Sequence, residues 1–199
     1  MPAALPARIA EYLGRLPEGI DSFPNFRVQG TVVRMWLSGH DPAPLLAMLP
    51  GPVDRLVRAE LAADTWVSEV HATVVYLALR ELFFTSDDAF VADAYARNRQ
   101  LLAGAAFSMM PLLTPANIDV QSRRAFRSMH DGIAVVTDVS RQPWTWSLTF
   151  PSYLVPQLLA RCYVTALAAA LESVGKQAVY VELLNHEPDR IDIALLFEH

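Results

Sequence analysis

The chain has 199 residues, a formal net charge of -5, 53% apolar residues and 19% charged residues. This composition excludes intrinsic disorder, because so many apolar side chains can form a buried core. The acidic balance argues against nucleic acid as a partner, since phosphate binding needs clustered lysine and arginine. The length predicts a single domain over residues 1–199.

The sequence shows no signal for export or membrane insertion. The N-terminal segment 1–19 lacks the apolar core of a signal peptide. The most apolar long segment, 153–175, contains polar and charged side chains and therefore predicts a buried helix with no membrane span. One cysteine, Cys162, excludes an internal disulfide and a zinc site of several thiolates, so we expect no metal. We expect a cytoplasmic protein.

Proline and glycine divide the first part of the chain into short helices. We expect helices over about 6–16 and 30–38, with Gly39 ending the second, and another from Val53 onward. The segment 66–84 has apolar residues at three- and four-residue spacing. This spacing predicts a longer helix.

Two further helices are expected before the chain changes its pattern. The segment 86–88 combines serine and aspartate and favours a helix start, and Pro111 is expected to end that helix. A further helix is expected to begin at 114–115, with proline at its first position, and to end at 130–132.

The second half alternates apolar and polar residues, as strands with one buried face do. Segments 133–139 and 144–150 predict one hairpin. A helix over 153–174, ended by Gly175, leads to a second hairpin with its turn at 185–190.

These elements predict an α+β fold, with a helical N-terminal half packed with a four-stranded antiparallel sheet in the C-terminal half. The sheet is expected to follow a hairpin–helix–hairpin order. The predicted parts are an N-terminal extension with a short helix over 1–27, a helical half over 28–131 and a ββαββ half over 132–199.

This order of elements and three segments resemble a known superfamily. The segments are VQGTVVRMWL (28–37), LLAMLPG (45–51) and FPSYLVPQLLARCYVTALAAALESVG (150–175), together with the helix that contains Trp66. They are similar to an uncharacterised myxobacterial family related to the haem-NO-binding-like, 4-vinyl-reductase-like and TRAPP-subunit-like ligand-binding domains. The resemblance implies a regulatory or ligand-binding domain that forms a homodimer.

Two departures from these relatives bear on cofactors. Zinc-binding members of the 4-vinyl-reductase-like group that the chain resembles use several cysteines, whereas this chain has one. Haem-binding members of the superfamily that the chain resembles carry a Tyr-x-Ser-x-Arg signature that holds the haem propionates. No such spacing occurs in this sequence. We therefore predict no cofactor, with haem as the alternative.

If haem is the cofactor, the histidines are the candidate ligands of its iron. His71 lies on an apolar helix face, from which one ring nitrogen could bind haem iron. Because no second ligand follows at helical spacing, a structural histidine is the favoured interpretation of His71. His130 is interpreted as a helix cap, with axial ligation as its alternative. We expect His40 and His186 to be solvated.

Aromatic residues give the strongest indication of a ligand site. Such side chains line pockets for apolar ligands, but they also form cores or seal a dimer. The candidate ligand-pocket residues are Trp66, His71, Trp144, Trp146, Phe150, Tyr153 and Tyr163.

The basic cluster QSRRAFR is a second candidate surface. Arg123, Arg124 and Arg127 could contact an acidic partner or an anion, and a solvated helix face is the alternative. The sequence contains no nucleophile elbow and no glycine-rich phosphate loop, and Cys162 has no indicated base. We name no catalytic residues and expect no enzyme.

We therefore predict a non-enzymatic sensor or protein-interaction module. It would bind a small apolar or aromatic ligand between helices and sheet, form a homodimer and act through a separate signalling protein. The apolar helix 153–174 favours this prediction, because its surface needs covering on two sides. The alternative is a haem-binding gas or redox sensor with a histidine axial ligand.

Overall fold

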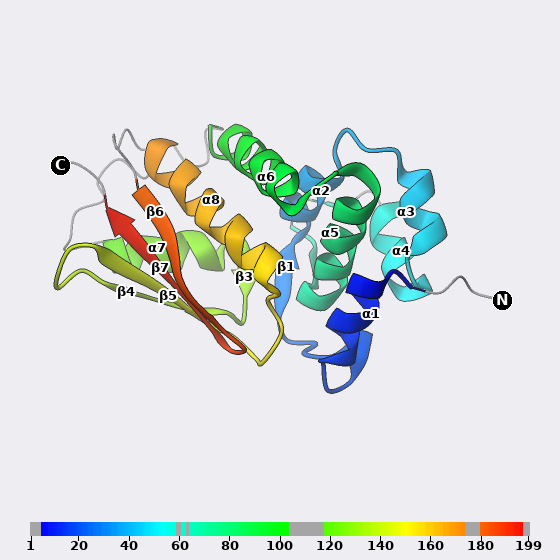
Figure 1. The fold of residues 1–199 in the computed structure, drawn as a ribbon, viewed down its shortest axis with the longest axis horizontal. Coiled ribbons are helices and arrows are strands. Elements are labelled where there is room, and N and C mark those ends of the chain that lie inside the picture. Colours follow the sequence, from blue (N-terminus) through cyan, green and yellow to red (C-terminus); the bar gives the residue numbers. More distant parts are fainter. Residues whose placement is uncertain (1–4, 59–60, 63, 104–117, 174–179, 197–199) are drawn as a thin grey trace. The chain divides into compact units, whose positions relative to one another are not determined.

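The computed structural model describes most of the chain, which divides into two compact units (Figure 1). One unit contains residues 1–90 and 129–132, and the other contains 91–128 and 133–199. The single domain over 1–199 stays a prediction. The described residues are 5–58, 61–62, 64–103, 118–173 and 180–196.

The first unit is mainly helical and carries a small sheet (Figure 1). This sheet is antiparallel, in the order β2-β1-β3. The elements are α1 (Ala7–Gly14), the 3-10 helix η1 (Gly19–Asp21), β1 (Arg27–Gln29), α2 (Gly30–Leu37), α3 (Pro42–Met48), α4 (Gly51–Arg58), β2 (Trp66–Ser68), α5 (Glu69–Phe83) and β3 (His130–Asp131).

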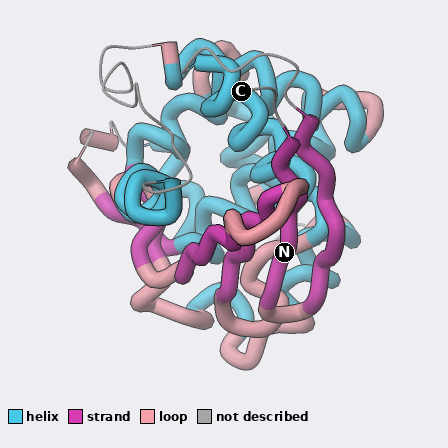
Figure 2. Tube along the Cα trace, turned by 90° about the vertical axis from the view of Figure 1, so that its left-hand side faces the viewer, coloured by secondary structure: helices cyan, strands magenta, loops and turns pink. Residues whose placement is uncertain are grey.

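The second unit is built on a four-stranded antiparallel sheet, whose strands are drawn in magenta in Figure 2. The strand order is β4-β5-β7-β6, so the two hairpins meet through β5 and β7. Helix α6 (Asp87–Leu102) begins in the first unit and continues in the second. The other elements are α7 (Ile118–Arg127), β4 (Ala134–Asp138), β5 (Trp144–Thr149), α8 (Gln157–Ser173), β6 (Tyr180–Glu187) and β7 (Arg190–Leu196).

The predicted α+β class and the four-stranded C-terminal sheet are confirmed. Alternation along β5 buries Trp144, Trp146 and Leu148 on one face, as the period-two pattern predicts. Among the described residues, none of the helices has the length and apolar character needed to cross a membrane.

Helix α5 is the central helix of the first unit. Nearly every residue from Glu69 to Leu79 is buried. A helix that is apolar around most of its circumference must be covered on several sides. One cover is α2, whose Trp36 ring packs on Tyr76 at 5.2 Å between centroids and stacks on Phe90 at 4.7 Å.

The predicted helix over 66–84 is wrong at its first turn. Trp66 to Ser68 form strand β2, in which Val67 lies opposite Val28 of β1. The Ser68 hydroxyl then accepts the His71 backbone N–H at 3.4 Å, so the helix begins at Glu69. A serine cap at this position overrides the helical spacing that precedes it.

The expected helix end at His130 is also wrong. Helix α7 ends at Arg127, and His130 pairs as a strand residue with Val28. The helix end expected at Pro111 and the helix start expected at 114–115 lie outside the described residues.

Two boundaries in the second half differ from the predictions. Helix α8 begins at Gln157 rather than 153, because Pro156 restricts the residue before it to an extended backbone. The second hairpin turn consists of Pro188 and Asp189 alone, since both strands extend into the predicted 185–190 turn. The predicted stop at Gly175 lies outside the described residues.

Candidate functional site

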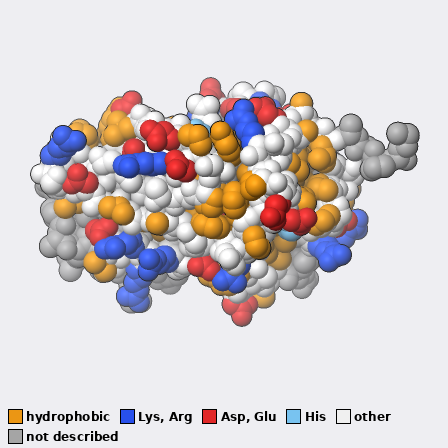
Figure 3. Space-filling model, turned by 90° about the horizontal axis from the view of Figure 1, so that it is seen from below, with side chains coloured by type: hydrophobic (Ala, Val, Ile, Leu, Met, Phe, Trp, Pro, Cys, Tyr) orange, Lys and Arg blue, Asp and Glu red, His pale blue; other side chains and the backbone are white. Residues whose placement is uncertain are grey.

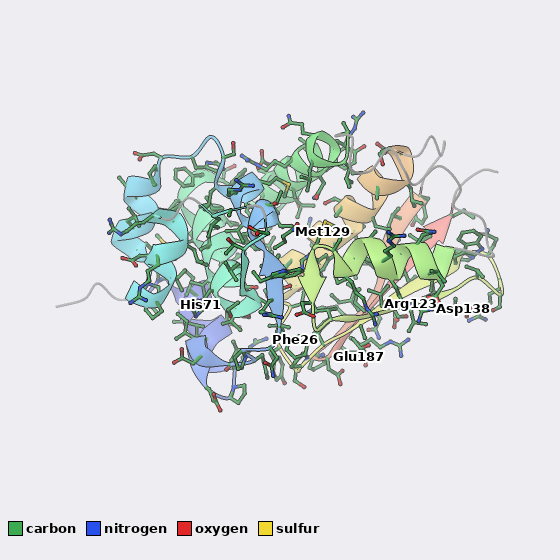
Figure 4. The ribbon with its side chains drawn as sticks, turned by 180° about the vertical axis from the view of Figure 1, so that it is seen from behind. Phe26, His71, Arg123, Met129, Asp138 and Glu187 are labelled. Atoms are coloured by element: carbon green, nitrogen blue, oxygen red, sulfur yellow. The ribbon has the colours of Figure 1, made fainter. Side chains whose placement is uncertain are left out.

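His71 lies in the first turn of α5, and its side chain is half-buried (Figure 4). Burial lowers the pKa of His71, outweighing the opposing effects of the Asp21 charge and of a hydrogen bond to the Ile20 backbone. The neutral imidazole is therefore favoured at neutral pH. A neutral ring with one nitrogen hydrogen-bonded to backbone is the form in which histidine binds a metal through its other nitrogen.

A second histidine is held by a carboxylate in the same unit. His130 Nδ1 lies 2.5 Å from Glu69 Oε1, and the two side chains are 11% and 6% exposed. The small sheet brings them together, because Glu69 directly follows β2 and His130 begins β3. With Nδ1 engaged by Glu69, only Nε2 of His130 could bind iron. The predicted helix-capping role of His130 is wrong.

The polar interior of the first unit continues from Glu69 to α1. Tyr12 is buried, and its phenol hydrogen-bonds to the Thr73 side chain on α5. Burial raises the pKa of Tyr12, and the nearby Glu69 carboxylate raises it further. Tyr12 therefore stays protonated and can act as a hydrogen-bond donor.

The candidate pocket residues are divided between the two units. Trp66 and His71 belong to the first unit, and Trp66 is half-buried with the Arg27 guanidinium 6.0 Å from its ring centre. Tyr153, in the second unit, is 41% exposed and has a positive φ of 68°. Its backbone N–H donates to the Pro188 carbonyl, which fixes this turn before α8.

The other aromatic candidates lie on the inner face of the larger sheet or on α8. Trp144, Trp146 and Phe150 are buried. The Phe126 ring of α7 meets Trp146 edge-on at 5.6 Å and lies 5.8 Å from the ring of Tyr163. Sequence reasoning placed Trp146 and Tyr163 here but missed Phe126. Its signal was its position as the apolar residue inside the basic segment QSRRAFR.

The three basic candidates lie on α7, where Figure 4 labels Arg123. Arg123 forms an ion pair with Asp119 one helical turn earlier, whereas Arg124 and Arg127 are exposed. The face drawn in Figure 3 carries both basic and acidic side chains. Apart from the ion pair between Arg123 and Asp119, the structure offers no observation that supports anion binding at these arginines.

The other two histidines in the described part of the chain are not simply solvated. His40 stacks on the Phe83 ring at 4.6 Å and meets Phe84 edge-on. His186 is half-buried, and its Nε2 lies 3.0 Å from the Val155 carbonyl oxygen. Cys162 is buried on α8. In the part of the chain that the structure describes, no three metal-binding side chains cluster.

The described elements define an α+β fold with a four-stranded antiparallel sheet in its C-terminal half. H-NOX domains are among the solved structures to which this fold is similar. A variant H-NOX from T. Tengcongensis matches with a TM-score of 0.52 at 9% identity, over 86% of this chain and 98% of that chain. A structure concerning haem distortion in the H-NOX family matches with a TM-score of 0.54 at 10% identity, over 86% of this chain and 95% of that one.

A third solved structure concerns modulation of haem redox potential by porphyrin distortion. It matches with a TM-score of 0.54 at 8% identity, over 85% of this chain and 99% of that chain. At these identities the likeness shows the fold, and it confirms the expected relation to the haem-NO-binding-like fold. No protein-family model and no curated protein matches the sequence.

These matches correct the prediction of no cofactor. The solved neighbours are H-NOX domains, and two of them are described through their haem. The prediction relied on a missing propionate signature and a single cysteine. Neither feature decides whether a histidine of the chain can bind iron.

Proposed function

We propose that the chain is a haem-binding gas or redox sensor with His71 as an axial ligand of the iron. The observation that carries the proposal is the H-NOX fold, shared over most of the chain with haem-containing neighbours. A non-catalytic role, a homodimer and a separate signalling protein as the output are parts of the same proposal.

The side-chain chemistry of His71 fits an axial ligand. The lowered pKa favours the neutral ring, in which one nitrogen carries the proton and can donate to the Ile20 backbone. The second nitrogen then presents its lone pair. The helix cap formed by Ser68 places His71 in the first turn of a buried helix.

His130 is the alternative ligand within the same proposal. Its contact with Glu69 would fix the orientation of the ring, as carboxylates do for metal-bound histidines. His71 is preferred because its side chain is half-buried and can be reached, whereas the His130 side chain is only 11% exposed. When bound, haem would supply an iron centre that takes a diatomic gas or changes its oxidation state.

An absorption spectrum of protein purified with haem supplied tests the proposal. We expect a Soret band that His71→Ala abolishes or shifts, whereas the matched control His186→Gln leaves it unchanged. Far-UV circular dichroism verifies that each variant is folded. Absence of a Soret band under every loading condition overturns haem binding. A band lost in a folded His130→Ala variant but kept in His71→Ala overturns the assignment to His71.

A further inference from the structure

Two buried polar atoms of the second unit lack hydrogen-bond partners among the described residues. They are Thr137 Oγ1 on β4 and Trp146 Nε1 on β5. The side chains belong to residues that are 9% and 6% exposed. Buried polar atoms are nearly always satisfied in folded proteins, so each exception calls for a specific cause.

The two atoms belong to directly opposed residues. Thr137 and Trp146 are partners across the β4–β5 ladder, and both are buried. Side chains opposed in this way stand about 5 Å apart at their Cβ atoms. One acceptor atom between them could therefore receive hydrogen bonds from both the indole N–H and the threonine hydroxyl.

The surroundings restrict the chemistry of such an acceptor. The Phe126 and Tyr163 rings continue the aromatic surface beyond Trp146. The nearby Asp119 carboxylate is engaged, because Oδ1 accepts the Thr137 backbone N–H at 3.0 Å and Oδ2 pairs with Arg123. A negative charge beside Asp119 would be repelled, so an uncharged oxygen on an aromatic body fits best.

We propose that Thr137 and Trp146 form a binding site for an uncharged aromatic molecule that carries one carbonyl oxygen. The oxygen accepts from Trp146 Nε1 and Thr137 Oγ1, and the aromatic body packs with Phe126 and Tyr163. All four residues belong to the second unit, whereas His71 belongs to the first, and the proposal does not depend on haem binding.

Acetophenone and ethylbenzene make a matched pair of probes, since only acetophenone carries the oxygen. The readout is the indole N–H resonance of Trp146 in a nitrogen-correlated spectrum, assigned by its loss in Trp146→Phe. We expect acetophenone to move this resonance strongly. Isothermal titration calorimetry, which does not need the Trp146 resonance, should show about tenfold weaker binding of acetophenone to Thr137→Val and Trp146→Phe. Ethylbenzene should bind all three proteins alike.

Trp144→Phe is the control variant, because Trp144 is a buried indole on the same strand and face. It should leave acetophenone affinity within about twofold of the parent. If acetophenone does not move the Trp146 resonance and the indole N–H shows a cross-peak to a long-lived water, a structural water satisfies the two polar atoms. That result overturns the proposal. Equal loss of acetophenone affinity in Trp144→Phe also overturns it.

Discussion

At the residue scale, Glu69 is the side chain on which the polar interior of the first unit depends. It contacts His130 Nδ1 and lies close enough to Tyr12 to influence the phenol. Its backbone N–H donates to the Phe26 carbonyl at 2.9 Å, so the main chain is fixed as well. A carboxylate in such a buried position needs its partners, because desolvation of an unpaired charge is costly.

Replacing Glu69 by alanine should destabilise the protein by about 3 kcal/mol, because His130 loses a buried partner. Urea denaturation followed by circular dichroism measures the free energy of unfolding. The matched control is Glu11→Ala, which removes an exposed pair with Arg15 within α1 and should cost less than about 0.5 kcal/mol. Equal losses in the two variants would contradict a special role for Glu69.

The sequence could identify His71 and His130 as candidates, because histidine chemistry is readable from residue type alone. It could not identify Glu69 as the partner of His130, since the two residues are 61 positions apart. Neither helical nor strand periodicity relates residues at that separation. Their contact depends on the pairing of strands that sequence reasoning did not detect.

At the element scale, the short strand β3 ends at a backbone turn that only glycine adopts easily. Gly132 has a φ of 98°, a region that residues with a Cβ rarely occupy. A Cβ placed there would lie 2.8 Å from Phe26 Cδ1 and 3.1 Å from the Asn25 carbonyl oxygen. Backbone conformation and space therefore both require glycine.

The variant Gly132→Ala should lower the free energy of unfolding by about 2 kcal/mol, through strain and the Phe26 clash. Gly14→Ala is the control, because a Cβ at this last residue of α1 meets nothing within 4 Å. Alanine there should be neutral or stabilising by up to about 1 kcal/mol. Thermal unfolding compares the two, and an unchanged melting temperature for Gly132→Ala would refute the argument.

Long elements were predictable, and short ones were not. The hairpin of β4 and β5 shows period-two alternation over enough residues to be recognised. Strands β1, β2 and β3 have two or three residues each, which is too short for any period to be visible. Their pairing joins Val28 with Val67 and His130, so only the folded chain reveals it.

At the scale of the whole molecule, the fold depends on many residues along the chain, whereas a cofactor site depends on a few. Identities of only 8–10% with these solved structures accompany TM-scores of 0.54, so the fold is shared although most individual residues differ. A cofactor depends on a few atoms at one place. This is why the candidate ligands His71 and His130 need a spectroscopic test even where the fold is clear.

Stability in acid should depend on the ion pairs around Asp87, which join α1, α5 and the start of α6. Asp87 Oδ1 accepts from Arg80 Nε at 2.6 Å and from Arg8 Nη1 at 3.0 Å. Burial alone would raise the pKa of Asp87, but these arginines outweigh it and lower the pKa below its ordinary 3.8. A carboxylate whose pKa is lower in the folded state than in the unfolded state stabilises the protein at pH values above the unfolded-state pKa. This stabilisation is lost as the pH falls through the folded-state pKa.

The variant Asp87→Asn should therefore be less stable than the parent by up to about 1 kcal/mol near neutral pH. The difference should begin to narrow as the pH falls below 3.8, where the carboxyl of the unfolded parent becomes protonated, and should vanish once the pH is below the lowered pKa of folded Asp87. Urea denaturation at a series of pH values measures the difference. Since Asp87 also lies in the first turn of α6, part of the loss reflects the helix dipole, and Asp88→Asn in the same turn is the control for that part. A difference that stays constant from neutral pH into strong acid would show that the charge of Asp87 does not contribute to stability.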